Sequence, residues 1–224
     1  MPALRGSLTY ARFFVEGEVP DDHRERFMRS IRLRAMKPLE PDDEDLERSG
    51  WAKLGEPQTL ELHYDDVFWN EYVNLTFRTD RWVLPPAVLR ARVKEAEAAY
   101  LQKKGRERLS RSEKSELKLL VAKKLRRTLE PAMRAIDVSW SVGEGIVRFF
   151  SHATKPAGVM MDLFKKTFGL ALVPESPYSL AARIGLSKSE ESVWKDLAMT
   201  GLGTLPGGDE LVFDEASDGR GASV

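Results

Sequence analysis

Apolar residues in the first third of the chain alternate with polar ones in short stretches, interrupted by one longer helical pattern. Alternation with many aromatic and β-branched residues predicts a strand at 8–19. The acidic segment 20–22 suits the start of a helix, and apolar residues at helical spacing continue to Met36 before Pro38 ends the pattern. After an acidic loop at 41–47, further short strands are predicted at 50–52, 59–64 and 72–77.

The middle of the chain predicts two consecutive helices. The prolines at 85–86 suit a first helical turn, where a proline loses no hydrogen bond. Gly105 breaks this helix, and Ser110 with Glu113 has the spacing of a capping box that starts the next one, which we expect to end before Pro131. The buried side of the second helix is predicted from its apolar positions Leu117, Leu120, Val121, Leu125 and Leu129.

The last structured part predicts a β-hairpin at 135–141 and 146–151, a helix at 154–168 and a strand at 170–174. This order of elements predicts an α+β fold with a mixed or antiparallel sheet, helices packed on one face, and a basic helical pair in addition. The predicted parts are an N-terminal α+β lobe at 1–82, the basic helical pair at 83–134, a hairpin-helix-strand lobe at 135–186 and a mobile acidic tail at 187–224.

The composition limits the kinds of chemistry that the chain can perform. Its 224 residues can bury a hydrophobic core. The chain has no cysteine, which excludes disulfides, thiolate metal sites and thiol nucleophiles. It shows no apolar stretch of signal-peptide length and none long enough to span a bilayer. We therefore expect a cytoplasmic protein without a membrane segment.

The formal net charge is zero, but the charges are segregated along the chain. Residues 90–134 contain fifteen Lys and Arg against six Glu, an excess of nine positive charges. The flanking segments are acidic, with fifteen Asp and Glu against eight Lys and Arg at 16–66, and eight against three at 188–224. Such segregation creates a local positive field that the net charge conceals.

The predicted helical pair is therefore the strongest candidate site. Lys and Arg neutralise phosphates without reading bases, so a dense series of them predicts binding to the duplex backbone that weakens as salt is added. The same residues would also suit an exposed helix surface on which Glu–Lys pairs only aid solubility. The candidate DNA contacts are Lys103, Lys104, Arg106, Arg108, Arg111, Lys114, Lys118, Lys123, Lys124 and Arg127.

Several features, taken in their order along residues 1–185, resemble the recombination-associated protein RdgC family. The features are local and short, so the resemblance comes from their order and spacing. They are the opening strand and helix, the step Gly50-Trp51, the helix start Leu84-Pro85-Pro86-x-Val88-Leu89, the Lys- and Glu-rich helix pair with the segment 112–118, and the hairpin, helix and strand that end at Val173-Pro174.

The resemblance implies an α+β protein that dimerises into a ring, binds duplex DNA without marked sequence preference through a basic inner surface, and restrains recombinase filaments of the RecA type. It therefore predicts a homodimer, a RecA-type recombinase as a partner and association with the nucleoid. Longer members of the family have a C-terminal part that builds part of the ring. We expect this chain to be a short form without that part. It also has no counterpart at 125–131 of an aromatic residue that members can use in dimer contact.

Two other classes of function remain open. A protein–protein adaptor could use the acidic segments to bind a basic partner, or the basic helices to bind an acidic one. A metal-dependent exonuclease would need carboxylates that converge on a divalent ion, but the acidic clusters at 42–45 and 65–66 lie outside the basic segment. His23, His63 and His152 are isolated. We therefore expect a non-enzymatic protein without catalytic residues, metal or cofactor.

Overall fold

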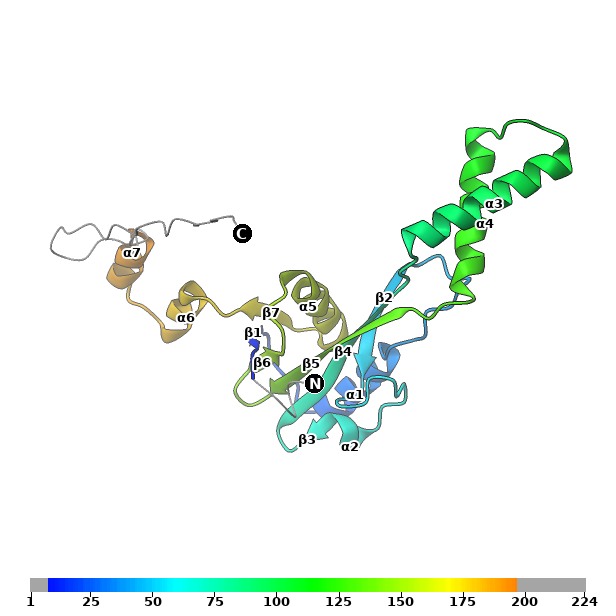
Figure 1. Ribbon diagram of the computed structural model, residues 1–224. Helices are drawn as coiled ribbons and strands as arrows, with labels where there is room; N and C mark the ends of the chain where they lie inside the picture. The colour runs from blue at the N-terminus through cyan, green and yellow to red at the C-terminus, as the bar shows by residue number, and fades with distance from the viewer. Residues whose placement is uncertain (1–7, 197–224) are drawn as a thin grey trace, which may run out of the picture. The chain divides into compact units, whose positions relative to one another are not determined.

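The computed structural model describes residues 8–196 and shows, within them, one seven-stranded sheet with helices (Figure 1). The strands have the order β2-β4-β5-β6-β1-β7, and β3 pairs with β4. Neighbouring strands of this sheet are antiparallel throughout. The strands are β1 (Ala11–Glu16), β2 (Glu47–Ala52), β3 (Phe68–Trp69), β4 (Tyr72–Arg81), β5 (Ala132–Ser141), β6 (Ile146–Phe149) and β7 (Ala171–Pro174).

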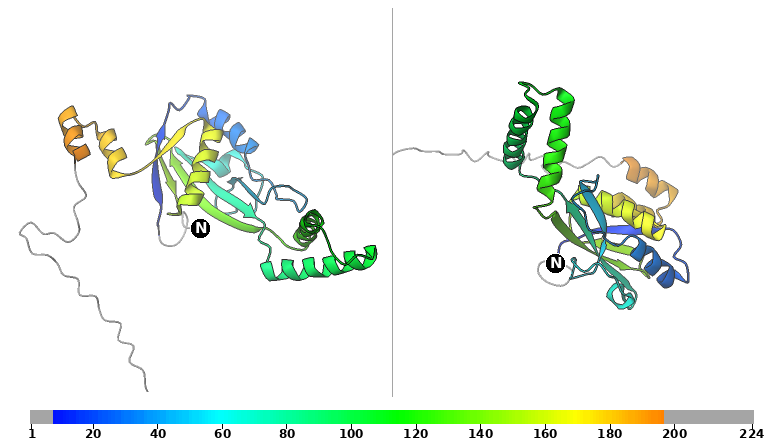
Figure 2. Two further views of the ribbon diagram at one scale, coloured as in Figure 1. Left: turned by 90° about the horizontal axis from the view of Figure 1, so that it is seen from above. Right: turned by 90° about the vertical axis from the view of Figure 1, so that its right-hand side faces the viewer.

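The helices complete an α+β fold, which confirms the predicted class. Figure 2 shows α1 and α5 on the same face of the sheet, and both helices contribute side chains to one core. The chain divides into two compact units, Met1–Ser179 and Leu180–Val224. The helices are α1 (His23–Leu33), α2 (Tyr64–Val67), α3 (Pro86–Lys104), α4 (Arg111–Arg126), α5 (Thr154–Phe168), α6 (Pro177–Ile184) and α7 (Lys188–Asp196).

The core lies between the sheet and these two helices. Alternate residues of the central strands face it, as period-two alternation requires, and α5 adds residues one helical turn apart. Strands from the predicted segments 1–82 and 135–186 therefore share one sheet and one core. The core side chains of β4, β5 and α5 are Val73, Leu75, Phe77, Ile136, Val138, Trp140, Met160, Phe164 and Phe168.

The step from Gly50 to Trp51 joins the edge of the sheet to the core. A Cβ on Gly50 would lie 2.6 Å from Cα of Met36, so only glycine lets the segment after α1 approach β2 this closely. That approach allows the N–H of Met36 to donate to the carbonyl oxygen of Trp51 at 2.7 Å. The Trp51 side chain is fully buried, and its Nε1 donates to Oγ1 of Thr167 in α5 at 2.8 Å.

The local signals at 85–113 place both ends of α3 and the start of α4 as predicted. Pro86 is the first residue of α3, and Gly105 ends it with φ of 61°, in the left-handed region that favours glycine. The capping box at the start of α4 is confirmed: the N–H of Glu113 donates to Oγ of Ser110 at 3.2 Å, and the N–H of Ser110 donates to the Glu113 carboxylate at 2.8 Å.

The strand predicted at 59–64 is wrong. Residues 59–63 have no strand pairing in the structure, and Tyr64 begins α2. The N–H of His63 donates to the Asp66 carboxylate at 3.0 Å, which stabilises a helix start where alternation suggested a strand. Only Leu62 of this stretch is buried, so its side chain anchors the loop to the core.

Several predicted boundaries shift by a few residues. The first strand is shorter than 8–19, and the second helix of the pair ends at Arg126, five residues before Pro131. The β-hairpin and the last strand occur near their predicted positions. Helix α7 begins the segment 187–224 that the sequence predicts as a mobile acidic tail, and residues 197–224 of that segment lie outside the described residues.

Candidate nucleic-acid interface

Helices α3 and α4 form a two-helix hairpin, called the helical hairpin below, in the connection between β4 and β5 (Figure 1). In this fully described stretch, α3 has no buried residue and α4 has one, Ala122. The sequence predicts Leu120 and Leu129 on the buried side of the second helix, and both predictions are wrong. Leu120 of α4 is 64% exposed, and Leu129, which follows α4, is 39% exposed. The two helices pack mainly on each other, so their apolar residues are only partly covered.

All ten cations that the sequence predicts as DNA contacts lie at exposed positions on or beside the helical hairpin. Three of them are held in ion pairs: Arg106 contacts Glu113 at 2.8 Å, and Lys123 and Arg127 contact Asp42 at 3.0 and 3.1 Å. The other predicted cations have no ion pair within residues 8–196; they are Lys103, Lys104, Arg108, Arg111, Lys114, Lys118 and Lys124.

The acidic loop before β2 neutralises the C-terminal end of α4. The Asp42 carboxylate accepts hydrogen bonds from Lys123 and Arg127, which lower the pKa of Asp42 below its usual value. Beside it, Nη1 of Arg126 donates to the carbonyl oxygen of Asp43 at 3.1 Å. Lys123 and Arg127 therefore already have a carboxylate counter-ion in the free protein.

Two grooves run between α3 and α4. Arg90 and Lys94 line one groove, and Arg92 and Glu95 line the other. Residues four apart on a helix share a side, whereas residues two apart point in nearly opposite directions. The two grooves therefore open on different sides of the helical hairpin, and the basic residues of the two helices are divided between them.

The two grooves differ in charge. The first has a volume of about 380 Å³ and brings Arg90, Lys94 and Lys118 together with one carboxylate, Glu97. In the second groove Arg92 is paired with Glu95 at 2.9 Å, which leaves Lys124 as its unpaired cation within the described residues. We call the first one the cationic groove.

The cationic groove continues toward the tip of the helical hairpin. Lys114 and Arg111 precede Lys118 by four and seven residues on α4, so they follow it along one side of that helix. Both are exposed and unpaired within residues 8–196. Five cations thus lie along one side, which gives an extended positive surface.

Arg90 and Lys94 belong to this surface but are absent from the ten contacts that the sequence predicts. In the sequence they contribute only to the excess of nine positive charges at residues 90–134. A usable signal exists in the sequence, because their spacing of four residues repeats that of Lys114 and Lys118 on the second helix. Which side of α3 faces the Lys118 side of α4 is decided by the packing of the two helices.

The acidic clusters considered for a nuclease have other contacts. Asp43 and Asp45 lie 2.9 and 3.4 Å from Nη2 of Arg48, and Asp66 lies 3.2 Å from Nζ of Lys53. Within residues 8–196, no group of three or more His, Asp or Glu side chains is arranged to hold a metal ion. These carboxylates therefore stabilise loops around β2.

Several other side chains have structural roles. Asp80 is buried on β4 and receives two hydrogen bonds from the guanidinium of Arg78, at 2.8 and 2.6 Å. Trp69 is 42% exposed, and its Nε1 donates to the carbonyl oxygen of Asp65 at 2.9 Å. The Met160 side chain is fully buried in the core.

These observations define an α+β protein whose exposed helical hairpin carries a cationic groove. Neither a comparison with models of protein families nor a comparison with curated proteins gives a match. No helix between residues 8 and 196 is both long enough and apolar enough to cross a membrane.

Proposed function

We propose that the protein binds duplex DNA without sequence preference, through the cationic groove of the helical hairpin. The observation that supports this proposal most directly is the convergence of Arg90, Lys94 and Lys118 on one groove that holds a single carboxylate. Arg111 and Lys114 extend the positive surface along the same side of α4. The flexible, exposed cations and the scarcity of aromatic side chains suit phosphate contacts better than base recognition.

The dimensions of the groove fit a short stretch of duplex. A helix rises 1.5 Å per residue, so the fourteen steps from Arg90 to Lys104 in α3 span roughly 21 Å. Duplex DNA carries one phosphate charge per about 1.7 Å of axis, and this length therefore faces about a dozen phosphates from both strands. Five cations can each find a phosphate on the near side without a defined register.

We further propose that DNA occupancy modulates recombination by restraining recombinase filaments of the RecA type. The proposal rests on the resemblance of the chain to the RdgC family and requires no chemical step. A protein that covers phosphates over a short stretch competes with any filament that needs the same backbone. The protein then acts as a non-enzymatic, nucleoid-associated factor.

The test is fluorescence anisotropy of a labelled random duplex at several salt concentrations. With five phosphate contacts, the slope of log K against log salt should be about −4 to −5, since each contact contributes about −0.9. Duplexes of unrelated sequence should bind alike. The same measurement with magnesium, followed by a check of DNA length, tests for a nuclease.

Each result separates the classes of function. Shortened DNA would contradict a function by DNA occupancy and would indicate a metal-dependent exonuclease. If no duplex binds even at low salt, DNA binding is refuted and a protein–protein adaptor becomes the better hypothesis. Binding that does not change with salt would contradict the phosphate contacts that the cationic groove is proposed to make.

We also propose that the protein is a homodimer, with the helical hairpin in the dimer contact. The adjacent Leu119 and Leu120 are 65% and 64% exposed on α4, and neighbouring apolar side chains at this exposure favour a covered state. A hairpin of two helices that lacks a core of its own can complete one by packing on a second copy.

Replacing both leucines by serine is therefore expected to shift a dimer toward monomer in analytical ultracentrifugation over a range of concentrations. The matched control is the double replacement of Leu33 and Leu46 by serine, because these leucines are also exposed, at 69% and 55%, but lie outside the helical hairpin. An unchanged dimer in the α4 variant, or equal dissociation in both variants, would contradict the proposed contact.

A further inference from the structure

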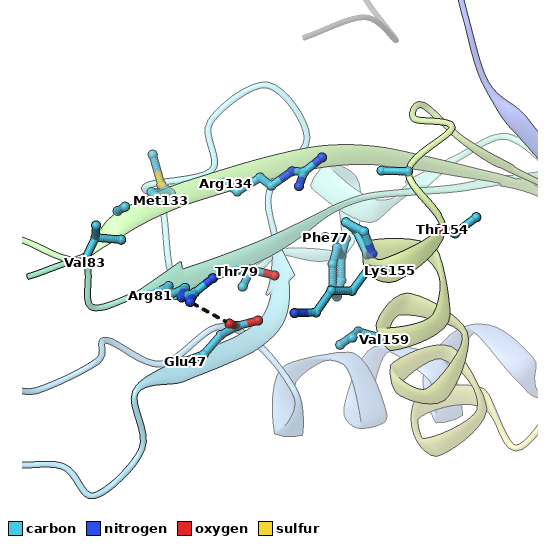
Figure 3. A pocket seen from close by; sticks show the side chains of 13 residues that line it. Glu47, Phe77, Thr79, Arg81, Val83, Met133, Arg134, Thr154, Lys155 and Val159 are labelled. Carbon is cyan, nitrogen blue, oxygen red and sulfur yellow. Dashed lines mark ion pairs between the residues drawn. The ribbon is translucent and has the colours of Figure 1, made fainter.

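A third groove lies outside the helical hairpin, between the C-terminal end of β4, the N-terminal end of β5 and the first turns of α5 (Figure 3). We call it the strand-end groove, and its volume is about 480 Å³. Thr79 and Arg81 of β4 line one wall, and Lys155 and Val159 of α5 line the opposite wall. It shares no lining residue with the cationic groove.

The strand-end groove exists because the strands continue beyond the helix that covers them. Phe77 pairs with Ile136 at the last position where both residues are buried in the core. Beyond it, Thr79 pairs with Arg134 and Arg81 with Ala132, and these residues face the same side of the sheet as Phe77. This part of the helix-facing side therefore has no helix over it.

The strand-end groove exposes apolar side chains. Val83 is 59% exposed and Val159 is 38% exposed, and both line the groove. Phe77 lies behind them, at the edge of the core. A ligand that places an apolar group here would remove this surface from water.

The rim of the strand-end groove is positively charged. Arg81, Arg134 and Lys155 line it together with one carboxylate, Glu47, which lies 3.8 Å from Nε of Arg81. Within residues 8–196, neither Arg134 nor Lys155 forms an ion pair. The rim therefore has two cations without a counter-ion beside the exposed apolar residues.

We propose that the strand-end groove binds an acidic segment of a partner protein in which carboxylates flank a large apolar side chain. The charge of the rim is complementary to the carboxylates, and the exposed apolar residues are complementary to the side chain between them. The DNA backbone would leave those apolar residues uncovered, since it is charged throughout. The exposure of Val83 and Val159 shows a groove open to solvent, which suits a peptide better than an enclosed small molecule.

The experiment uses the full chain and a fluorescein-labelled peptide of the sequence Asp-Glu-Asp-Leu-Phe-Glu-Asp. We expect saturable binding by anisotropy, and about two- to thirtyfold weaker binding to a variant with Arg134 and Lys155 replaced by alanine, because two exposed charge contacts are lost. The matched control replaces Lys165 and Lys166, two exposed lysines at the other end of α5, by alanine and should bind as the wild type does.

Two further arms identify the occupant. A peptide with Ser-Ser in place of Leu-Phe should bind weakly, and equal binding of both peptides would overturn the proposal by reducing it to charge attraction. Equal loss in the control variant would overturn it as well. If the Arg134 and Lys155 variant loses affinity for duplex DNA while peptide binding is unchanged, the groove serves nucleic acid instead.

Discussion

Replacing Arg90, Lys94 and Lys118 together by alanine is expected to weaken duplex binding about 500-fold at roughly 0.1 M salt. The figure follows from counterion release, because each lost phosphate contact removes about 0.9 from the slope of log K against log salt, and three contacts remove about 2.7 log units relative to 1 M salt. The slope itself should become shallower by about three. Anisotropy titrations of one duplex at four or five salt concentrations measure both quantities.

The matched control removes three cations from the other side of the helical hairpin. Replacing Arg92, Lys103 and Lys124 by alanine lowers the net charge equally. Arg92 and Lys124 line the second groove, and Lys103 follows Arg92 by about three turns on the same side of α3. We expect less than about a tenfold loss for this variant, because only the long-range field changes. Equal losses in the two variants would contradict the cationic groove as the binding surface and would indicate diffuse attraction to the whole hairpin.

Replacing Trp51 by alanine is expected to lower the free energy of unfolding by about 3–5 kcal/mol, the range measured when large aromatic residues are removed from cores. The side chain is fully buried and contacts the rings of Phe77 and Phe168, with centroids 6.4 and 6.1 Å away. Its loss also leaves Thr167 without the Nε1 donor. Urea unfolding followed by circular dichroism measures the change.

Trp69 provides a matched tryptophan-to-alanine control. It is 42% exposed at the β3–β4 turn, so its replacement should cost about 1 kcal/mol or less. The variant Trp51→Phe keeps an aromatic ring in the core but removes the N–H and part of the apolar volume, and we expect a loss between these two values. Equal stability of the Trp51→Ala variant and the wild type would contradict the position of this side chain in the core.

The sequence allowed both ends of α3 and the start of α4 to be predicted because the signals that set them are local. Gly105 ends α3 through its own backbone conformation, and Ser110 and Glu113 cap α4 across three residues. The exposure of the ten predicted cations could likewise be expected, since long charged side chains are rarely buried. Their contact with DNA stays a prediction.

The partners of those cations could not be predicted, because they depend on distances between segments that are remote in the sequence. Asp42 lies more than eighty residues before Lys123 and Arg127, yet its carboxylate pairs with both. Arg90 and Lys94 join Lys118 only because of the angle at which α3 packs on α4. The sequence pattern of one helix does not determine the angle at which it packs on another helix.

The error at 59–64 has a similar origin. A segment with alternating residues can form a strand only if a neighbouring strand has free backbone N–H and C=O groups. The strand β4 is already paired with β2, β3 and β5. Leu62 is buried as a single anchor, and the capping contact between His63 and Asp66 turns the chain into α2. The local pattern was the same for a strand and for an anchored loop.

The sequence by itself thus determined the α+β class, the two hairpin helices and the positive charge that they carry, because periodicity, capping and composition are local properties. Tertiary structure alone decided which cations share a groove and which are neutralised by Asp42. It also decided that β4 and β5 extend beyond α5 and expose Arg81 and Arg134. These features depend on how helices and strands pack across the chain, and packing brings together residues that sequence spacing cannot relate.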